Sequence, residues 1–180
     1  MKVFIAGARA ITYLELAVLN RLENIFKKQY TVFVGDASGV DSFVQKFFAA
    51  KNYKNLSVFA SNGIARNNLG NWQVVNVPVN GKTKGFDFYV AKDIEMANKA
   101  DCGFMIWNGE SKGTFNNIIN LLKQNKITEL YYTPNKKFYT IRNFEDLDLF
   151  IKNNVKLSFK LTKMIPPKPL SKNIQMQLIL

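Results

Sequence analysis

Along residues 1–133, short apolar runs alternate with segments in which apolar residues recur every three or four positions. Strands are predicted at the runs Val3–Ala6, Thr31–Val34, Leu56–Ala60, Val74–Val79, Cys102–Trp107 and Thr128–Tyr132. Amphipathic helices are predicted at Thr12–Lys28, Val40–Ala50, Phe86–Lys99 and Gly113–Gln124. Because the strands are continuous apolar runs, both faces of their sheet are expected to be buried. The order of elements therefore predicts an α/β protein with a three-layer Rossmann-like fold and a mostly parallel central sheet.

Two local signals refine these elements. Thr12 is the expected N-cap of the first helix, and Glu15, three residues on, completes the pattern of a capping box. Residues 61–73 are rich in Asn and Gly and predict a long loop between two strands.

The pattern changes after Pro134, and residues 134–180 are expected to form a short C-terminal α/β appendage. An edge strand is predicted at Phe138–Ile141 and a short helix, capped by Asn143, at Phe144–Ile151. Val155–Ile165 alternates apolar and polar residues, which predicts a half-buried strand. The apolar tail Ile174–Leu180 is expected to dock on another surface.

The composition limits the chemistry open to the chain. Its 180 residues suit one domain with an appendage, and they include no histidine and one cysteine, Cys102. Histidine-based triads, histidine metal ligands and a structural zinc site are thereby excluded. Neither a metal nor a cofactor is expected. No apolar stretch is long enough for a membrane span, and Met1–Gly7 is too short for a signal peptide, so a cytoplasmic protein is expected.

The net charge of +12 indicates an acidic partner or a solvated surface. Six lysines and no acidic residue fall in residues 150–180, which therefore carry half of the net charge. This basic tail is a candidate contact for nucleic acid. Pairing of an edge strand or docking of the tail would instead give a homo-oligomer.

Three glycine-containing loops follow predicted strands, at the sheet edge where open α/β sheets bind ligands. They are Gly7-Ala8-Arg9, Gly35–Asp41 and Asn108–Thr114. Each precedes a helix, whose unpaired backbone amides and positive dipole end attract anions. None of the loops is a Walker A or a GxGxxG motif. Together they predict a cleft for a phosphate or a nucleotide.

At these loops, and at Lys92-Asp93-Ile94-Glu95-Met96, the sequence resembles the SLOG superfamily, and most closely its YspA-like (cpYpsA-related) branch. The superfamily also includes LOG-type phosphoribohydrolases and the Rossmann-like core of DprA. The resemblance runs from Met1 to about Tyr132, and it implies a nucleotide-binding Rossmann-like domain over residues 1–133. It implies ligand binding by Gly7, Ala8, Arg9, Gly35, Asp36, Ser38, Gly39, Asp41, Lys92, Asp93, Asn108, Gly109, Ser111, Lys112, Gly113 and Thr114.

The chain departs from the pattern of these relatives at informative places. Asp36 replaces a glycine, Ser38 replaces an arginine, and Asn117 stands where LOG-type enzymes have a catalytic glutamate. An amide cannot act as a general base, so the first hypothesis is a sensor or binding module for a nucleotide or a nucleotide-derived phosphorylated ligand. Trp107 or Phe86 is a candidate to stack on its base.

Two alternatives stay open. One is an N-glycosidic hydrolase or deoxyribosyltransferase acting on nucleoside phosphates, with Asp36 and Glu110 as candidate catalytic carboxylates. The other is binding of single-stranded nucleic acid, which the relation to DprA implies and which the basic tail would support.

Overall fold

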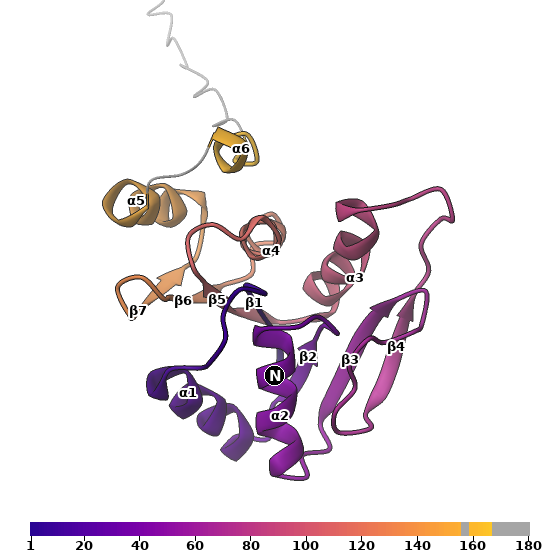
Figure 1. Ribbon diagram of the computed structural model, residues 1–180. Coiled ribbons are helices and arrows are strands. Elements are labelled where there is room, and N and C mark those ends of the chain that lie inside the picture. Colours follow the sequence, from indigo (N-terminus) through magenta and orange to yellow (C-terminus); the bar gives the residue numbers. More distant parts are fainter. Residues whose placement is uncertain (156–158, 167–180) are drawn as a thin grey trace, which may run out of the picture.

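A seven-stranded, mostly parallel sheet forms the centre of the molecule, in a computed structural model that describes residues 1–155 and 159–166 (Figure 1). Its strands are β1 (Lys2–Gly7), β2 (Thr31–Val34), β3 (Leu56–Ser61), β4 (Gln73–Val77), β5 (Cys102–Trp107), β6 (Thr128–Tyr132) and β7 (Lys137–Ile141). They lie in the order β4-β3-β2-β1-β5-β6-β7, and β7 alone runs antiparallel to its neighbour among these strands. The α/β class and the parallel sheet are thus confirmed.

Helices cover both faces of the sheet. They are α1 (Leu16–Lys27), α2 (Val40–Ala50), α3 (Phe86–Lys99), α4 (Lys112–Leu122), α5 (Phe144–Asn154) and α6 (Phe159–Thr162). In Figure 1, α1 and α2 lie on one side of the sheet, and α3, α4, α5 and α6 lie on the other. The result is the three-layer, Rossmann-like arrangement that the sequence predicts.

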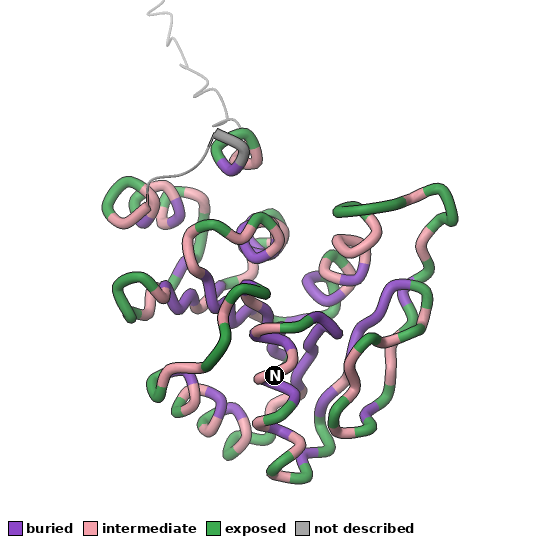
Figure 2. The backbone as a smooth tube through the Cα atoms, in the orientation of Figure 1, coloured by how far each residue is buried: buried purple, intermediate pink, exposed green. Residues whose placement is uncertain are grey.

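The first strand shows why the strand sequences are apolar without interruption. Val3 and Ile5 belong to the core beneath α1 and α2, whereas Phe4 and Ala6 belong to the core beneath α3 and α4. Successive side chains of a strand point to opposite faces, so a sheet covered on both sides needs apolar residues at every position. Figure 2 shows the central strands as buried and the outward sides of the helices as exposed.

The first helix begins four residues later than expected. Its N-cap is Glu15, which makes no side-chain capping bond, so the capping box at Thr12 is wrong. The Glu15 carboxylate instead accepts a hydrogen bond from the Tyr13 hydroxyl and pairs with Lys136 Nζ at 3.0 Å. Residues 8–15 form a loop that leads from β1 into α1.

The C-terminal region differs from the expectation in one element. The edge strand β7 and the helix α5 are confirmed, and Asn143 caps α5 by accepting a bond from the Asp146 amide at 2.8 Å. The strand expected over Val155–Ile165 is wrong, because Phe159–Thr162 is helical. In that segment Leu161 is buried and Met164 and Ile165 pack on the same core, which is helical spacing. The expected tail Ile174–Leu180 lies outside the described residues.

Helix α5, which follows residue 133, packs in the same hydrophobic core as β5 and α4. Leu147 and Phe150 of α5 pack in the same cluster as Trp107 of β5 and Phe115 of α4. The core on this face therefore continues across residue 133 into the expected appendage. None of the helices in the described residues is both long and apolar enough to cross a membrane.

The strand order creates one favourable place for a ligand. β1 lies between β2 and β5, so the chain leaves β1 toward one side of the sheet and leaves β5 toward the other. The loops after these two strands therefore diverge and leave a crevice at the carboxyl ends of the strands.

Candidate functional site

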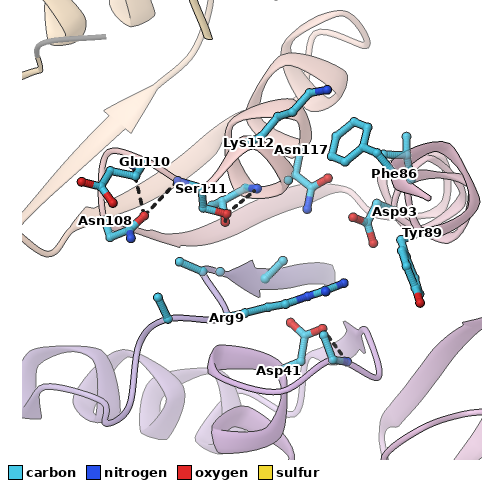
Figure 3. Close-up of a pocket in the computed structure, with 18 of the residues that line it drawn as sticks. Arg9, Asp41, Phe86, Tyr89, Asp93, Asn108, Glu110, Ser111, Lys112 and Asn117 are labelled. Carbon is cyan, nitrogen blue, oxygen red and sulfur yellow. Dashed lines mark hydrogen bonds between the residues drawn. The ribbon is translucent and has the colours of Figure 1, made fainter. Parts of the chain in front are cut away.

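A cleft of about 590 Å³ lies at this crevice (Figure 3). One wall is the loop after β1, from Gly7 to Ala10, and the opposite wall runs from Asn108 to Thr114 after β5. The amino-terminal half of α3, with Phe86 and Tyr89, closes a third side. The volume is typical of sites for small ligands.

Two exposed cations reach this cleft, and each lies over an aromatic ring of α3. The Arg9 guanidinium is 5.1 Å from the centroid of the Tyr89 ring, and Lys112 Nζ is 3.9 Å from that of Phe86. Within the described residues, neither cation has a carboxylate within ion-pair distance. The rings hold both cations by cation–π attraction and leave their hydrogen-bond donors available for an anion.

The amino end of α4 adds backbone donors to the same wall. Ser111 is the N-cap, and its Oγ accepts bonds from the Thr114 amide at 3.3 Å and from Thr114 Oγ1 at 3.0 Å. The Asn108 side chain orders the preceding turn by accepting from the amides of Glu110 and Ser111. At Gly113 an added Cβ would meet no atom within 4 Å, so the start of the helix is open. An eleven-residue helix with an open first turn favours an anion there.

Asn117 brings a buried polar group to the cleft. The residue is 3% exposed, and its Oδ1 has no hydrogen-bond partner in the part of the chain that the structure describes. Figure 3 shows the side chain directed from α4 into the space that Phe86 and Asp93 border. A buried carbonyl oxygen without a partner costs free energy, and a hydroxyl or amino group of a ligand would satisfy it.

The floor of the cleft holds a cluster of opposite charges around Lys92. Lys92 Nζ lies 2.7 Å from Asp93 Oδ1 and 3.9 Å from Asp36 Oδ1, and the lysine is 4% exposed. Asp41 Oδ2 accepts a hydrogen bond from the Ala37 amide at 3.2 Å. A Cβ at Gly35 would collide with Asp41 Oδ2 and Lys92 Nζ. Glycine at position 35 therefore makes room for this charge cluster.

The charge cluster shifts the pKa values of its members. Burial opposes the charge on Lys92, but Asp93, Asp41 and Asp36 together raise the lysine's pKa. Burial raises the pKa of Asp41 to about 6, although the attraction of Lys92 works against this rise. Lys92 is thus positive and surrounded by acids, whereas Arg9 and Lys112 face the cleft without a carboxylate partner among the described residues.

Asp36 is engaged away from the main cleft. Its carboxylate accepts bonds from Arg66 Nε at 2.9 Å, Arg66 Nη2 at 2.7 Å and the Arg66 amide at 3.1 Å. Burial alone would raise the pKa of Asp36, but the bonds from Arg66 and the charge of Lys92 lower it. Asp36 is therefore an ionised anchor for the loop between β3 and β4, and it lines a smaller neighbouring pocket.

Most of the residues predicted for the site are brought together. Those that line the main cleft are Gly7, Ala8, Arg9, Asp41, Lys92, Asp93, Asn108, Glu110, Ser111, Lys112, Gly113 and Thr114. Those outside its lining are Gly35, Asp36, Ser38, Gly39 and Gly109. The candidate catalytic carboxylates Asp36 and Glu110 line different pockets, and Figure 3 shows Glu110 pointing away from Asn117 and Phe86. Their catalytic role stays a prediction.

Three side chains depart from the sequence expectations. Trp107 is fully buried and stacked on Phe115, so it cannot contact a base, whereas Phe86 does line the cleft. Tyr89 and Arg66 were not expected in the site. Arg66 lies in an Asn- and Gly-rich loop whose sequence carries no motif, and only the fold brings it to Asp36.

The fold and cleft define a Rossmann-like α/β protein with a ligand crevice at its topological switch point. The described residues contain no group of three or more acidic or cysteine side chains that could hold a metal ion. No protein-family model matches the sequence, and no curated protein matches it.

Among solved structures, the chain is similar to DNA processing protein A (DprA) of Helicobacter pylori, whose structure is described as showing a unique single-stranded DNA binding mode. The identity is 12% and the TM-score is 0.59, over 92% of this chain and 78% of that chain. At this identity the similarity shows a distant DprA-like Rossmann fold.

Proposed function

We propose that this protein binds a nucleotide or nucleotide-derived phosphorylated ligand, as a sensor or binding module. Arg9 and Lys112 carry the proposal: they come from loops about 100 residues apart, and both end at one cleft without a carboxylate partner among the described residues. Lys112 and the amino end of α4 lie on one wall of the cleft and Arg9 lies on the opposite wall, so an anionic ligand would meet positive charge on both sides.

The remaining parts of a nucleotide have matching partners in the cleft. The exposed ring of Phe86 offers a surface for a base, and the unpaired Oδ1 of Asn117 would accept a hydrogen bond from a sugar hydroxyl. Asn117 is an amide where LOG-type enzymes have a carboxylate, which favours binding over cleavage. The order of the three loops supports a place in the SLOG superfamily, in its YspA-like branch.

Calorimetric titration tests the proposal. The ligands are AMP, GMP, CMP and UMP, their deoxy forms, and adenosine as the control without phosphate. We expect at least one nucleotide to bind with a dissociation constant below millimolar, and adenosine to bind more weakly than AMP. Arg9→Gln and Lys112→Gln should each weaken nucleotide binding roughly tenfold, because each removes a charged hydrogen bond.

Arg21→Gln is the matched control. Arg21 pairs with Glu129 at 3.2 Å and lies over the Phe138 ring, away from the cleft lining. Its replacement should leave the affinity unchanged. Nucleotide binding that does not respond to Arg9 or Lys112, or no binding at all, would contradict the proposal.

Single-stranded DNA is a second candidate, favoured by the structural similarity to Helicobacter pylori DprA. Cations that lie beside aromatic rings, as Arg9 and Lys112 do, are typical of single-strand sites. Fluorescence anisotropy with a labelled oligothymidylate over a salt series tests it. We expect steep salt dependence, and Arg9→Gln should reduce the slope by roughly 0.7, because one phosphate is no longer neutralised. No binding at low salt would exclude this candidate. A role of the basic tail at residues 150–180 in such binding stays a prediction.

A further inference from the structure

A second, smaller pocket adjoins the main cleft, on the side of the loop between β3 and β4. Its volume is about 210 Å³, and Tyr89 and Lys92 line both hollows. This volume is below the range typical of a complete small-ligand site, so the pocket suits one part of a ligand. Tyr89 therefore stands between the two hollows, so that a ligand held on both sides of it would span the cleft and the smaller pocket.

Arg66 presents a fixed guanidinium to the smaller pocket. Two of its side-chain N–H groups bind the two oxygens of Asp36, and the guanidinium lies 4.6 Å from the centroid of the Tyr89 ring. The Arg66 side chain is still 37% exposed. An arginine has five N–H donors, so donors remain for a ligand after the bonds to Asp36. A guanidinium held in this way loses little freedom when it binds a phosphate.

Apolar and amide groups complete the lining. Phe88 and Tyr89 contribute rings that meet edge to face, and Ile64 at the rim is 83% exposed. The Asn62 Oδ1 accepts a bond from the Val79 amide at 2.8 Å, which orients the side chain and leaves its Nδ2 as a donor. Rings beside an arginine and an oriented amide are suited to a second base and its phosphate.

The geometry points to a second nucleotide subsite in this smaller pocket, so that the protein takes two linked nucleotide units, one on each side of Tyr89. The inference rests on the proposed function, because the first unit is the nucleotide placed in the main cleft. Arg9 and Arg66, which both lie over the Tyr89 ring, would hold the phosphates of the two units. The ligand is either a free dinucleotide or two units of a single strand, since both offer the same chemistry.

The test compares the affinity of a mononucleotide with that of the matching 5′-phosphorylated dinucleotide. The probes are AMP and pApA, each in ribo and deoxy form, titrated calorimetrically into the full chain. We expect pApA to bind roughly tenfold more tightly than AMP, because a second base and a second phosphate are held by the protein. Ile64→Ala should bring this ratio toward one and leave the affinity for AMP unchanged. Arg66→Gln should also bring the ratio toward one.

The controls separate a binding role of these residues from a structural one. Ile127→Ala removes an exposed isoleucine at the amino end of β6, away from both pockets, and should leave the ratio unchanged. Arg142→Gln is the control for Arg66→Gln. It removes an exposed arginine that pairs with Asp146, and it should leave the ratio unchanged. A thermal melt of each variant reports on folding. Because Ile64 is largely exposed, Ile64→Ala tests the inference even if Arg66→Gln unfolds.

The outcomes distinguish this inference from the proposed function. Equal affinity for AMP and pApA would overturn the second subsite and leave nucleotide binding intact, whereas no binding of either probe would overturn both. A folded Arg66→Gln variant that weakens AMP and pApA equally would also overturn the subsite, because Arg66 would then act only by supporting Tyr89. A deoxyadenosine octamer that binds more tightly than the dinucleotide indicates a single strand, and equal affinity indicates a free dinucleotide.

Discussion

Asp41 offers a sharp test of the electrostatics at the floor of the cleft. The residue is 6% exposed, and among the described residues it has no cation within 4 Å, since Lys92 Nζ lies closer to Asp93 and Asp36. Burial therefore raises its pKa from the ordinary 3.8 to about 6. The perturbation is Asp41→Asn, which keeps the shape of the side chain and fixes it in the neutral state.

The magnitude follows from the linkage between protonation and folding. The pKa is higher in the folded chain than in the unfolded chain, so the protonated form favours folding. This contribution is fully present below the unfolded pKa of about 3.8, and it is lost as pH rises through about 6. A difference of about two pKa units corresponds to about 3 kcal/mol. The free energy of unfolding of the wild type, minus that of Asp41→Asn, should therefore fall by about 3 kcal/mol between pH 3 and pH 7.

Urea denaturation at a series of pH values measures both free energies. Taking the difference between the two proteins cancels the titration of carboxylates that are distant from residue 41. A difference that stays constant with pH would refute a raised pKa. A difference that increases with pH would show that attraction to Lys92 outweighs burial and lowers the pKa of Asp41.

Three further changes test other contacts. Asp36→Asn should cost about 2 kcal/mol of stability at pH 7, because it leaves Arg66 without its anion. Since the pKa of Asp36 is lowered in the fold, this cost should shrink as pH falls below 3.8, which urea denaturation at several pH values would measure. Gly39→Ala should destabilise the fold and weaken nucleotide binding in calorimetry, because position 39 has φ of 75° and a Cβ there would lie 2.5 Å from the Arg9 carbonyl oxygen. Trp107→Ala should cost about 3–5 kcal/mol in denaturant unfolding, because the side chain is fully buried; a loss under about 1 kcal/mol would contradict this packing.

The strands and most helices could be predicted because their patterns are local. Val40–Ala50 is a helix with the predicted bounds, and Cys102–Trp107 and Thr128–Tyr132 are strands with the predicted bounds. In the helix, apolar residues recur every three or four positions, and the two strands are short apolar runs whose length is typical of buried strands.

The sequence predictions are wrong in two kinds of place: where a local pattern fits both a strand and a helix, and where a residue distant in the chain binds a side chain expected to cap a helix. The segment Val155–Ile165 alternates like a strand, but Leu161, Met164 and Ile165 also have helical spacing, and the core beneath selects the helix. Glu15 has the spacing of a capping-box residue, but it pairs with Lys136, which is 121 positions away in the chain. Sequence spacing carries no information about such a partner.

The candidate site divides in the same way. The sequence by itself determined that glycine-containing loops follow parallel strands, and the rule that ligands bind beyond the carboxyl ends of such strands placed Arg9, Ser111 and Lys112 at one edge. It could not assign roles within that edge. Gly35 was expected to approach a ligand, yet it makes room for Asp41 and Lys92.

Only the tertiary structure decided which charges remain available to a ligand. Asp93 pairs with Lys92, whereas Arg9 and Lys112 meet aromatic rings, and Arg66 keeps N–H donors free beside its pair with Asp36. The physical reason is that the spacing of apolar residues is set by neighbours in the chain, whereas the Coulomb energy and the burial of a charge depend on distances in space. The sequence therefore determined the layers and the edge of the sheet, and the fold determined the chemistry of the cleft.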